Sequence, residues 1–312
     1  MNLRFLSIKF LRALVTLWLV VTFVFVILRL SGDPAEQLLP DDVAPEIIEF
    51  YRKQWGLDRP IWEQYVKYFQ AMAEGNFGRS FGDRREALVV ISERIPYTLQ
   101  LGLTVFITAM LLGIPSGIYA ALHRNSAADR ITMSFAVLGY SMPNFFLGIL
   151  LIFLFSLKLR WLPSSGAGTP WHMVMPVITL GTALAGSIAR FSRSAMLEVM
   201  NQDYIRTARS KGVRRLKRIY VHALPNAAIP IVTVVGFKLG ALIGGAVVTE
   251  NVFAWPGVGR LLVNAVGNRD LAVVQGIVML IAATMLVANL LVDIAYGWLD
   301  PRIRVAGDDT GR

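Results

Sequence analysis

Six long apolar runs constrain the fold of this chain more than any other feature of its sequence. A helix needs about 20 apolar residues to cross a bilayer core about 30 Å thick. Only two charged side chains, Arg29 and Lys238, fall within the runs. The runs cover residues 13–30, 97–122, 131–157, 173–189, 227–249 and 271–292. The sequence therefore predicts an all-α, polytopic integral membrane protein with six transmembrane helices.

Two alternatives to six spans are weaker. Buried helices of a large soluble protein rarely exceed about 20 residues and show a polar stripe, which these runs lack. A cleaved signal peptide would explain the basic start of the first run, but no small-x-small cleavage site follows Leu28. Charged residues make up only 17% of the chain, against about 25% in a typical soluble domain.

The sequence lacks the motifs of a self-powered enzyme or pump. No G-x-x-x-x-G-K-[ST] loop occurs, so no phosphate-binding loop of an ATPase is expected, and the three histidines lie in three different loops. Without cysteine, thiolate metal sites and disulfides are excluded. We expect no catalytic residue, no metal and no cofactor on this chain. Its charge of +10 is placed between apolar runs, which argues against a nucleic-acid partner.

Charge counting predicts the orientation. With the N-terminus in the cytoplasm, the cytoplasmic segments hold 17 Lys and Arg, and the two short external loops hold 4. We therefore expect an inner (plasma) membrane protein with both termini cytoplasmic. The expected parts are the N-terminal tail with the first span (1–30), a periplasmic helical segment (31–96), a transmembrane core (97–297) and a cytoplasmic tail (298–312).

The external segment 31–96 is predicted to fold. Residues 44–56 and 60–74 are typical of amphipathic helices, and Gly56 is the expected left-handed stop of the first. A third, short helix is expected from Arg84 to Arg94, ending before Pro96. These patterns favour a small helical subdomain over a plain connecting loop.

A basic cytoplasmic segment, residues 190–226, is the most informative part of the chain. It carries nine basic and two acidic side chains, and topology alone explains most of that charge. Its pattern predicts helix, turn, helix: Asp203 as N-cap, Gly212 as left-handed stop, and a second helix that ends before Pro225. A short helix pair with small residues at a tight turn is typical of an element that docks in a partner's groove.

The order Thr207-Ala208-x-x-x-Gly212, followed by Leu224-Pro225, resembles the E-A-A-x-x-x-G…L-P loop of ABC-transporter permeases. The chain departs from that pattern at Arg206, which replaces the glutamate, at Thr207, which replaces the first alanine, and at His222. The Arg-Thr-Ala variant resembles the dipeptide/oligopeptide/nickel branch. Six further segments match that branch in order: residues 31–34, 55–60, 140–143, 161–163, 253–259 and 300–304.

The resemblance implies the type I importer permease fold and a subunit that does no covalent chemistry. Such a subunit pairs with a second homologous permease and two cytoplasmic ATPases, which bind ATP and Mg²⁺, and a periplasmic binding protein delivers the substrate. The mechanism it implies is alternating access. The residues it assigns to ATPase coupling are Asp203, Tyr204, Arg206, Thr207, Ala208, Arg209, Lys211, Gly212, Leu224 and Pro225.

Two further sites are predicted with alternatives open. Lys238 points away from the row that begins at Gly236, so it either faces the translocation path or pairs with Asp293 or the partner permease. The external turn with Phe253, Trp255, Pro256 and Gly257 is either a periplasmic gate or an ordinary turn beside interfacial aromatic residues.

The substrate stays open among dipeptides, oligopeptides, glutathione-like peptides and nickel chelates. A self-sufficient secondary transporter or channel is the alternative function, although the spans carry few of the carboxylates that ion coupling needs.

Overall fold

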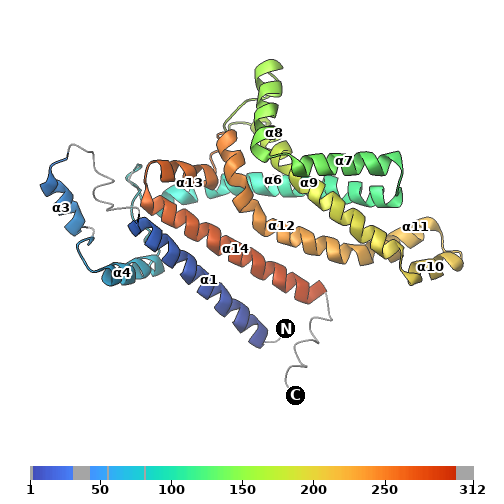
Figure 1. The fold of residues 1–312 in the computed structure, drawn as a ribbon, viewed down its shortest axis with the longest axis horizontal. Helices are drawn as coiled ribbons and strands as arrows, with labels where there is room; N and C mark the ends of the chain where they lie inside the picture. The colour runs from blue at the N-terminus through green and yellow to red at the C-terminus, as the bar shows by residue number, and fades with distance from the viewer. Residues whose placement is uncertain (1–2, 31–42, 55, 81, 300–312) are drawn as a thin grey trace. The chain divides into compact units, whose positions relative to one another are not determined.

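A computed structural model describes residues 3–30, 43–54, 56–80 and 82–299 (Figure 1). All regular secondary structure in these residues is helical. In chain order the elements are α1 (Leu3–Leu30), α3 (Pro45–Gln54), α4 (Ile61–Ala73), α5 (Ala87–Ser92), α6 (Ile95–Leu122), α7 (Ala127–Ser141), α8 (Asn144–Leu151), the π-helix η1 (Ile152–Lys158), α9 (Trp171–Met200), α10 (Asp203–Ser210), α11 (Arg215–Lys217), the π-helix η2 (Arg218–Ala223), α12 (Leu224–Val252), α13 (Val258–Gly267) and α14 (Leu271–Leu299).

The predicted all-α fold is confirmed, and each predicted span lies in helical structure. Four described stretches are long and apolar enough to cross a bilayer, and a bent helix pair supplies a fifth. The first predicted span lies in α1, a helix of 28 residues. The motifs at residues 31–34 and 300–304 lie outside the described residues, as does the tail beyond α14.

The third predicted span is not one straight helix. It is divided into α7 and the continuous pair α8–η1, which are bent by 101° relative to one another. Met142, between them, is extended at φ −79° and ψ 126°, and Pro143 begins the next helix. A residue that precedes proline is disfavoured in the α conformation, and proline has no N–H to continue the hydrogen bonding. The sequence interpretation took residues 131–157 as one apolar run and did not predict this break.

The chain divides into two compact units. The first comprises residues 97–259 and the end of α14 from Val287, and the second comprises α1 through Pro96 together with residues 260–286.

Close backbone contact holds the helices of the first unit together. A Cβ atom added at Gly117 of α6 would overlap the carbonyl oxygen of Ala189 in α9. One at Gly186 of α9 would overlap the carbonyl oxygen of Ala136 in α7. Small residues allow such approach, and in a bilayer helices associate through this packing because lipid is as apolar as the side chains. The glycines therefore set the spacing of α6, α7 and α9.

In the second unit, α4 packs on α1 through aromatic rings. The Phe25 ring lies 5.3 Å from that of Tyr65 and 5.4 Å from that of Tyr68, centroid to centroid. The Thr22 and Tyr65 hydroxyl oxygens are 2.7 Å apart. Burial raises the pKa of Tyr68 to about 12. The two amphipathic helices, α3 and α4, occur where expected, and Gly56 is left-handed at φ +66°.

The second half of the insertion is tied to the start of α14. The hydroxyl of Ser80 donates to the carboxylate of Asp270 at 2.5 Å, and that carboxylate also accepts from the backbone N–H of Val273. Asp270 is buried. α5 is shorter than the predicted 84–94 because Glu86, just before it, is extended at ψ 132°.

Gly117→Val tests the close packing of α6 on α9. The added side chain must push the backbones apart, so we expect a loss of stability on the order of 2 kcal/mol and a lower melting temperature in detergent. Gly102→Val on the same helix is the matched control, since a Cβ there meets nothing within 4 Å. Equal melting temperatures for the two variants would contradict the packing.

Candidate functional site

The basic segment 190–226 forms the predicted helix, turn and helix. α9 continues beyond the end of its apolar run to Met200, and α10 follows after a two-residue bend. α11 and the π-helix η2 then lead directly into α12 (Figure 1).

Gly212 makes the turn after α10. It is left-handed at φ +73°, as predicted, and its N–H donates to the carbonyl of Arg209 at 3.0 Å. The next N–H, of Val213, donates to the carbonyl of Ala208 at 3.0 Å. A Cβ at Gly212 would meet nothing within 4 Å. Glycine is therefore needed here for its backbone angle and not for lack of space.

Two local predictions about this segment were wrong. The N-cap of α10 is Gln202, extended at ψ 150°, and Asp203 is the first helical residue. Asp203 still favours the helix start through its charge, and it lies 3.5 Å from Arg206, with both side chains exposed. The second helix does not end before Pro225. Leu224 is helical, and Pro225 is the second residue of α12, inside the continuous helical stretch formed by α11, η2 and α12.

A buried apolar cluster anchors the segment, and its basic side chains stay largely exposed. Ile205 of α10 is 4% exposed and belongs to a buried cluster with Met196 of α9 and Ile219 of η2. Tyr204 and Leu216, by contrast, are 44% and 69% exposed. The basic side chains Arg206, Arg209, Lys211 and Arg214 are not buried either. The segment thus presents a cationic surface that also carries large apolar side chains, Tyr204 and Leu216 among them. Leu216 escaped the sequence interpretation because it stands within a basic run.

A partly buried ion pair joins the start of α7 to α9. Arg193 donates to Asp129 through Nε at 2.6 Å and through Nη2 at 2.7 Å. The Asp129 carboxylate also accepts from the N–H of Asn125 at 2.9 Å, and the hydroxyl of Ser126 accepts from the N–H of Asp129. Both partners were overlooked because 64 residues separate them. The pair fixes the α6–α7 loop to the helix that leads into the basic segment.

The turn between α12 and α13 is held in the protein interior. Phe253 and Trp255 are each 1% exposed, so these aromatic side chains are not interfacial residues that face lipid. The indole N–H of Trp255 donates to the carbonyl of Tyr97 at 2.9 Å. Phe253, Trp255, Pro256 and Gly257 therefore form a fixed element, and the role of gate stays a prediction.

A carboxylate that the sequence interpretation missed supports this turn. Glu250 is fully buried, and the hydroxyl of Thr98 donates to its Oε1 at 2.7 Å. The N–H of Val258 in turn donates to the Thr98 hydroxyl at 2.8 Å. A Cβ at Gly257 or Gly259 would overlap the carboxylate. The sequence signal that could have revealed Glu250 is an acidic residue directly after an apolar run.

Lys238 is half-buried in α12. The side chains of Arg29 and Asp293 lie outside the described residues. Among the side chains that are described, no group of three or more His, Cys, Asp or Glu is placed to hold a metal ion.

The chain matches two family models. Residues 113–305 match the model of the binding-protein-dependent transport system inner membrane component, and residues 2–102 match the model of the N-terminal part of such membrane components. The chain belongs to this family. It is a multi-pass permease subunit of an ABC importer.

Individual relatives agree with this assignment. The chain is 42% identical to the glutathione transport system permease protein GsiC of Escherichia coli K12 over 290 residues, 93% of this chain and 95% of that protein. The same figures hold for the protein of that name from Shigella dysenteriae. Among solved structures, it resembles the inward-facing MetNI methionine ABC transporter, with a TM-score of 0.58, 18% identity and coverage of 68% of this chain and 97% of that one. It also resembles an amino acid ABC transporter with histidines, with a TM-score of 0.53 and 16% identity. That match covers 67% of this chain and 94% of the other.

The Asp129–Arg193 pair of this permease makes a testable prediction. Removing one partner leaves a buried charge uncompensated, so Arg193→Met should lower stability by about 3 kcal/mol. Asp129→Asn should cost less, because the Arg193 side chain is 26% exposed and water can solvate it, and the loss in the double variant should fall well short of the sum of the two. Thermal unfolding of the four proteins in detergent measures this, and strictly additive losses would contradict a coupled pair.

Proposed function

We propose that this permease forms half of a translocation path for small peptides. It would act with a second homologous permease, two cytoplasmic ATPases and a periplasmic binding protein. The proposal draws on the dipeptide/oligopeptide/nickel-type motifs along the chain and on relatives named for glutathione transport. The observation that carries the proposal is membership of the permease family. That membership also weighs against a self-sufficient secondary transporter.

The test is reconstituted uptake with the cognate binding protein. We expect ATP-dependent accumulation of glutathione-like or other short peptides in proteoliposomes that contain both permeases and the ATPases. Nickel chelates serve as the comparison substrate. Uptake without the ATPases that collapses with the ion gradient would contradict the proposal.

The orientation follows from the distribution of basic residues. We propose that both termini and the segment 190–226 face the cytoplasm, where the excess of Lys and Arg is expected. The helical insertion 31–96 and the turn at 253–257 then lie on the periplasmic side. There the turn would seal the outer end of the path, and its buried indole–carbonyl bond supports a rigid seal.

The basic segment is the proposed coupling element. Its exposed turn at Gly212, together with the exposed side chains of Tyr204 and Leu216 on the flanking helices, would sit in a groove of an ATPase subunit. The apolar anchor at Ile205 makes the element rigid enough to transmit a push to α9 and η2. Closure of the ATPase dimer would thereby reorient the spans.

Gly212→Trp tests whether the turn couples ATP hydrolysis to uptake. We expect normal membrane insertion and subunit assembly, but ATP hydrolysis without peptide uptake, because the turn no longer fits the groove. Gly75→Trp is a matched control: Gly75 is also left-handed, at φ +74°, and a Cβ there also meets nothing within 4 Å. Unchanged transport by Gly212→Trp would refute the coupling role.

Lys238 is proposed to face the translocation path and attract a peptide carboxylate. A charge in the middle of a span is costly and normally faces a cavity or a partner. Lys238→Gln should therefore raise the KM for peptide uptake at least several-fold while assembly is retained. Normal uptake kinetics would remove this role, and loss of assembly would favour a structural pair with the partner permease.

A further inference from the structure

An apolar stripe of α4 is open on the surface of the second unit. Its members follow one another at i, i+4, i+7 and i+11, the spacing of one helix face, and they are Trp62, Val66, Phe69 and Ala73. Trp62 and Val66 are 67% and 46% exposed, and no side chain of α4 is buried. An open apolar face of this kind marks contact with a protein or a membrane.

The charged and amide side chains of α4 follow the same spacing, one position later. They are Glu63, Lys67, Gln70 and Glu74. One position along an α-helix is a rotation of 100°, so this polar stripe lies beside the apolar one and not within it. Glu63 is 3.6 Å from Arg59, and both side chains are partly exposed. The helix therefore has one side suited to lipid chains and one suited to headgroups or water.

A third face of α4 packs on α1. The rings of Tyr65 and Tyr68 lie 5.3 Å and 5.4 Å from that of Phe25, and the Tyr65 hydroxyl oxygen is 2.7 Å from that of Thr22. On a helical projection the two tyrosines stand about 100° from the centre of the apolar stripe, so this contact leaves the stripe free. Phe25 is 5% exposed. The contact therefore fixes α4 at one height on α1.

That height lies within the bilayer. The uncharged part of α1 is bounded by Arg12 and Arg29, so the membrane span cannot shift along the helix without burying a charge. At 1.5 Å per residue, Phe25 and Thr22 lie about 8 Å and about 12 Å from the end of the apolar run at Leu30. An interfacial helix buries its apolar face about 5–10 Å into the boundary between headgroups and acyl chains. The contact with Phe25 places α4 near that depth.

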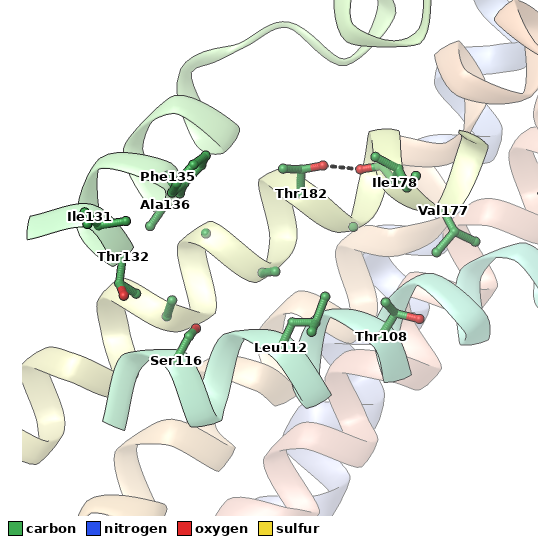
Figure 2. A pocket seen from close by; sticks show the side chains of 14 residues that line it. Thr108, Leu112, Ser116, Ile131, Thr132, Phe135, Ala136, Val177, Ile178 and Thr182 are labelled. Carbon is green, nitrogen blue, oxygen red and sulfur yellow. Dashed lines mark hydrogen bonds between the residues drawn. The ribbon is translucent and has the colours of Figure 1, made fainter. Parts of the chain in front are cut away.

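The exposure of α4 differs in origin from that of the spans. Leu112 of α6 and Phe135 of α7 stand at the rim of an open apolar groove of about 480 Å³ among α6, α7 and α9 (Figure 2). They are 61% and 71% exposed, and both belong to apolar runs that are long enough to cross the bilayer. α4 has only 13 residues and is too short to cross. Its contact with lipid must therefore come from its position on α1.

We propose that α4 is an interfacial membrane helix whose apolar stripe inserts among the lipids of the leaflet at the Leu30 end of α1. With the orientation proposed above, this is the outer leaflet. The polar stripe then meets headgroups and water, and Trp62 stands at the interface that indole rings favour. Lipid as well as α1 thus holds the insertion 31–96, which does not stand wholly in the periplasm.

A soluble partner fits the stripe less well than the bilayer does. To cover the stripe, such a partner would have to enter the membrane to the height of Phe25, where its backbone polar groups would lose their contact with water. A span of another subunit meets no such cost, and the experiment below distinguishes it from lipid.

Spin labels on single thiols test the proposal, since the chain has no cysteine of its own. The assembled transporter is reconstituted in liposomes of phosphatidylglycerol and phosphatidylcholine. Collisions of the label with oxygen, which partitions into lipid, are compared with collisions with chromium oxalate, which stays in water. We expect the oxygen-to-chromium ratio to be several-fold higher for Trp62→Cys than for Lys67→Cys, the matched control on the polar stripe. Phe135→Cys gives the reference value for a side chain exposed on a span.

A periodic pattern is expected along the helix. Val66→Cys and Ala73→Cys should resemble Trp62→Cys, and Gln70→Cys should resemble Lys67→Cys. If the label at position 62 prevents assembly, the ratios at 66 and 73 decide. A reversed orientation of the permease would move α4 to the other leaflet without changing these ratios, so it would not be confused with failure of the proposal.

Two outcomes would overturn the proposal. Equal ratios for Trp62→Cys and Lys67→Cys would place the stripe in water. A label at position 62 that is shielded from both reagents would show that protein covers the stripe. If that shielding requires the periplasmic binding protein, the binding protein is the occupant, and if it does not, the occupant is another membrane subunit.

Discussion

Close backbone packing around α9 is the constraint on which the rest of the first unit depends. In water, apolar side chains would drive the helices together, but in a bilayer that force is absent. Contact must then come from shape, and the glycines at 117 and 186 let the carbonyl groups of neighbouring helices come within van der Waals distance. α7 and α12 both pack extensively on α9 (Figure 1). A movement of α9 therefore displaces the helices that pack on it.

Three features of the first unit lie along this one helix. Its middle lines the open groove, Arg193 near its end binds Asp129, and Met196 in its last turns supports Ile205 of the basic segment. Because the helix continues without a break to Met200, a force on the basic segment is carried by a rigid rod instead of a loop. This continuity gives the proposed coupling element a mechanical connection to the membrane core.

Composition and local pattern predicted the helices but not the contacts between them. The six apolar runs, the amphipathic pair in the insertion and the left-handed Gly212 all depend on short stretches of sequence, and all occur. Prolines were harder, because their effect depends on position in the helix. Pro143 begins a new helix after a sharp bend, whereas Pro225 lies inside a helical stretch that continues through it from η2 into α12. Proline therefore produced one helix break that was not predicted, at Pro143, and no helix end where one was predicted, before Pro225.

Pairs distant in sequence gave no local signal at all. Asp129 with Arg193 and Thr98 with Glu250 are separated by 64 and 152 residues, and no spacing rule connects them. What they share is position: each acidic residue stands in the first or last turn of its helix. Asp270, just before α14, follows the same rule with Ser80.

These buried carboxylates show how the protein divides its polar and apolar contacts. A carboxylate is costly to bury, and hydrogen bonds from hydroxyl, guanidinium or backbone groups offset that cost. All three are placed near helix ends, where free backbone donors and loop residues are within reach. Such directional bonds resist displacement more than contacts between small residues do. The helix ends are thereby fixed to their neighbours by directional bonds, and the helix middles by close packing at the glycines.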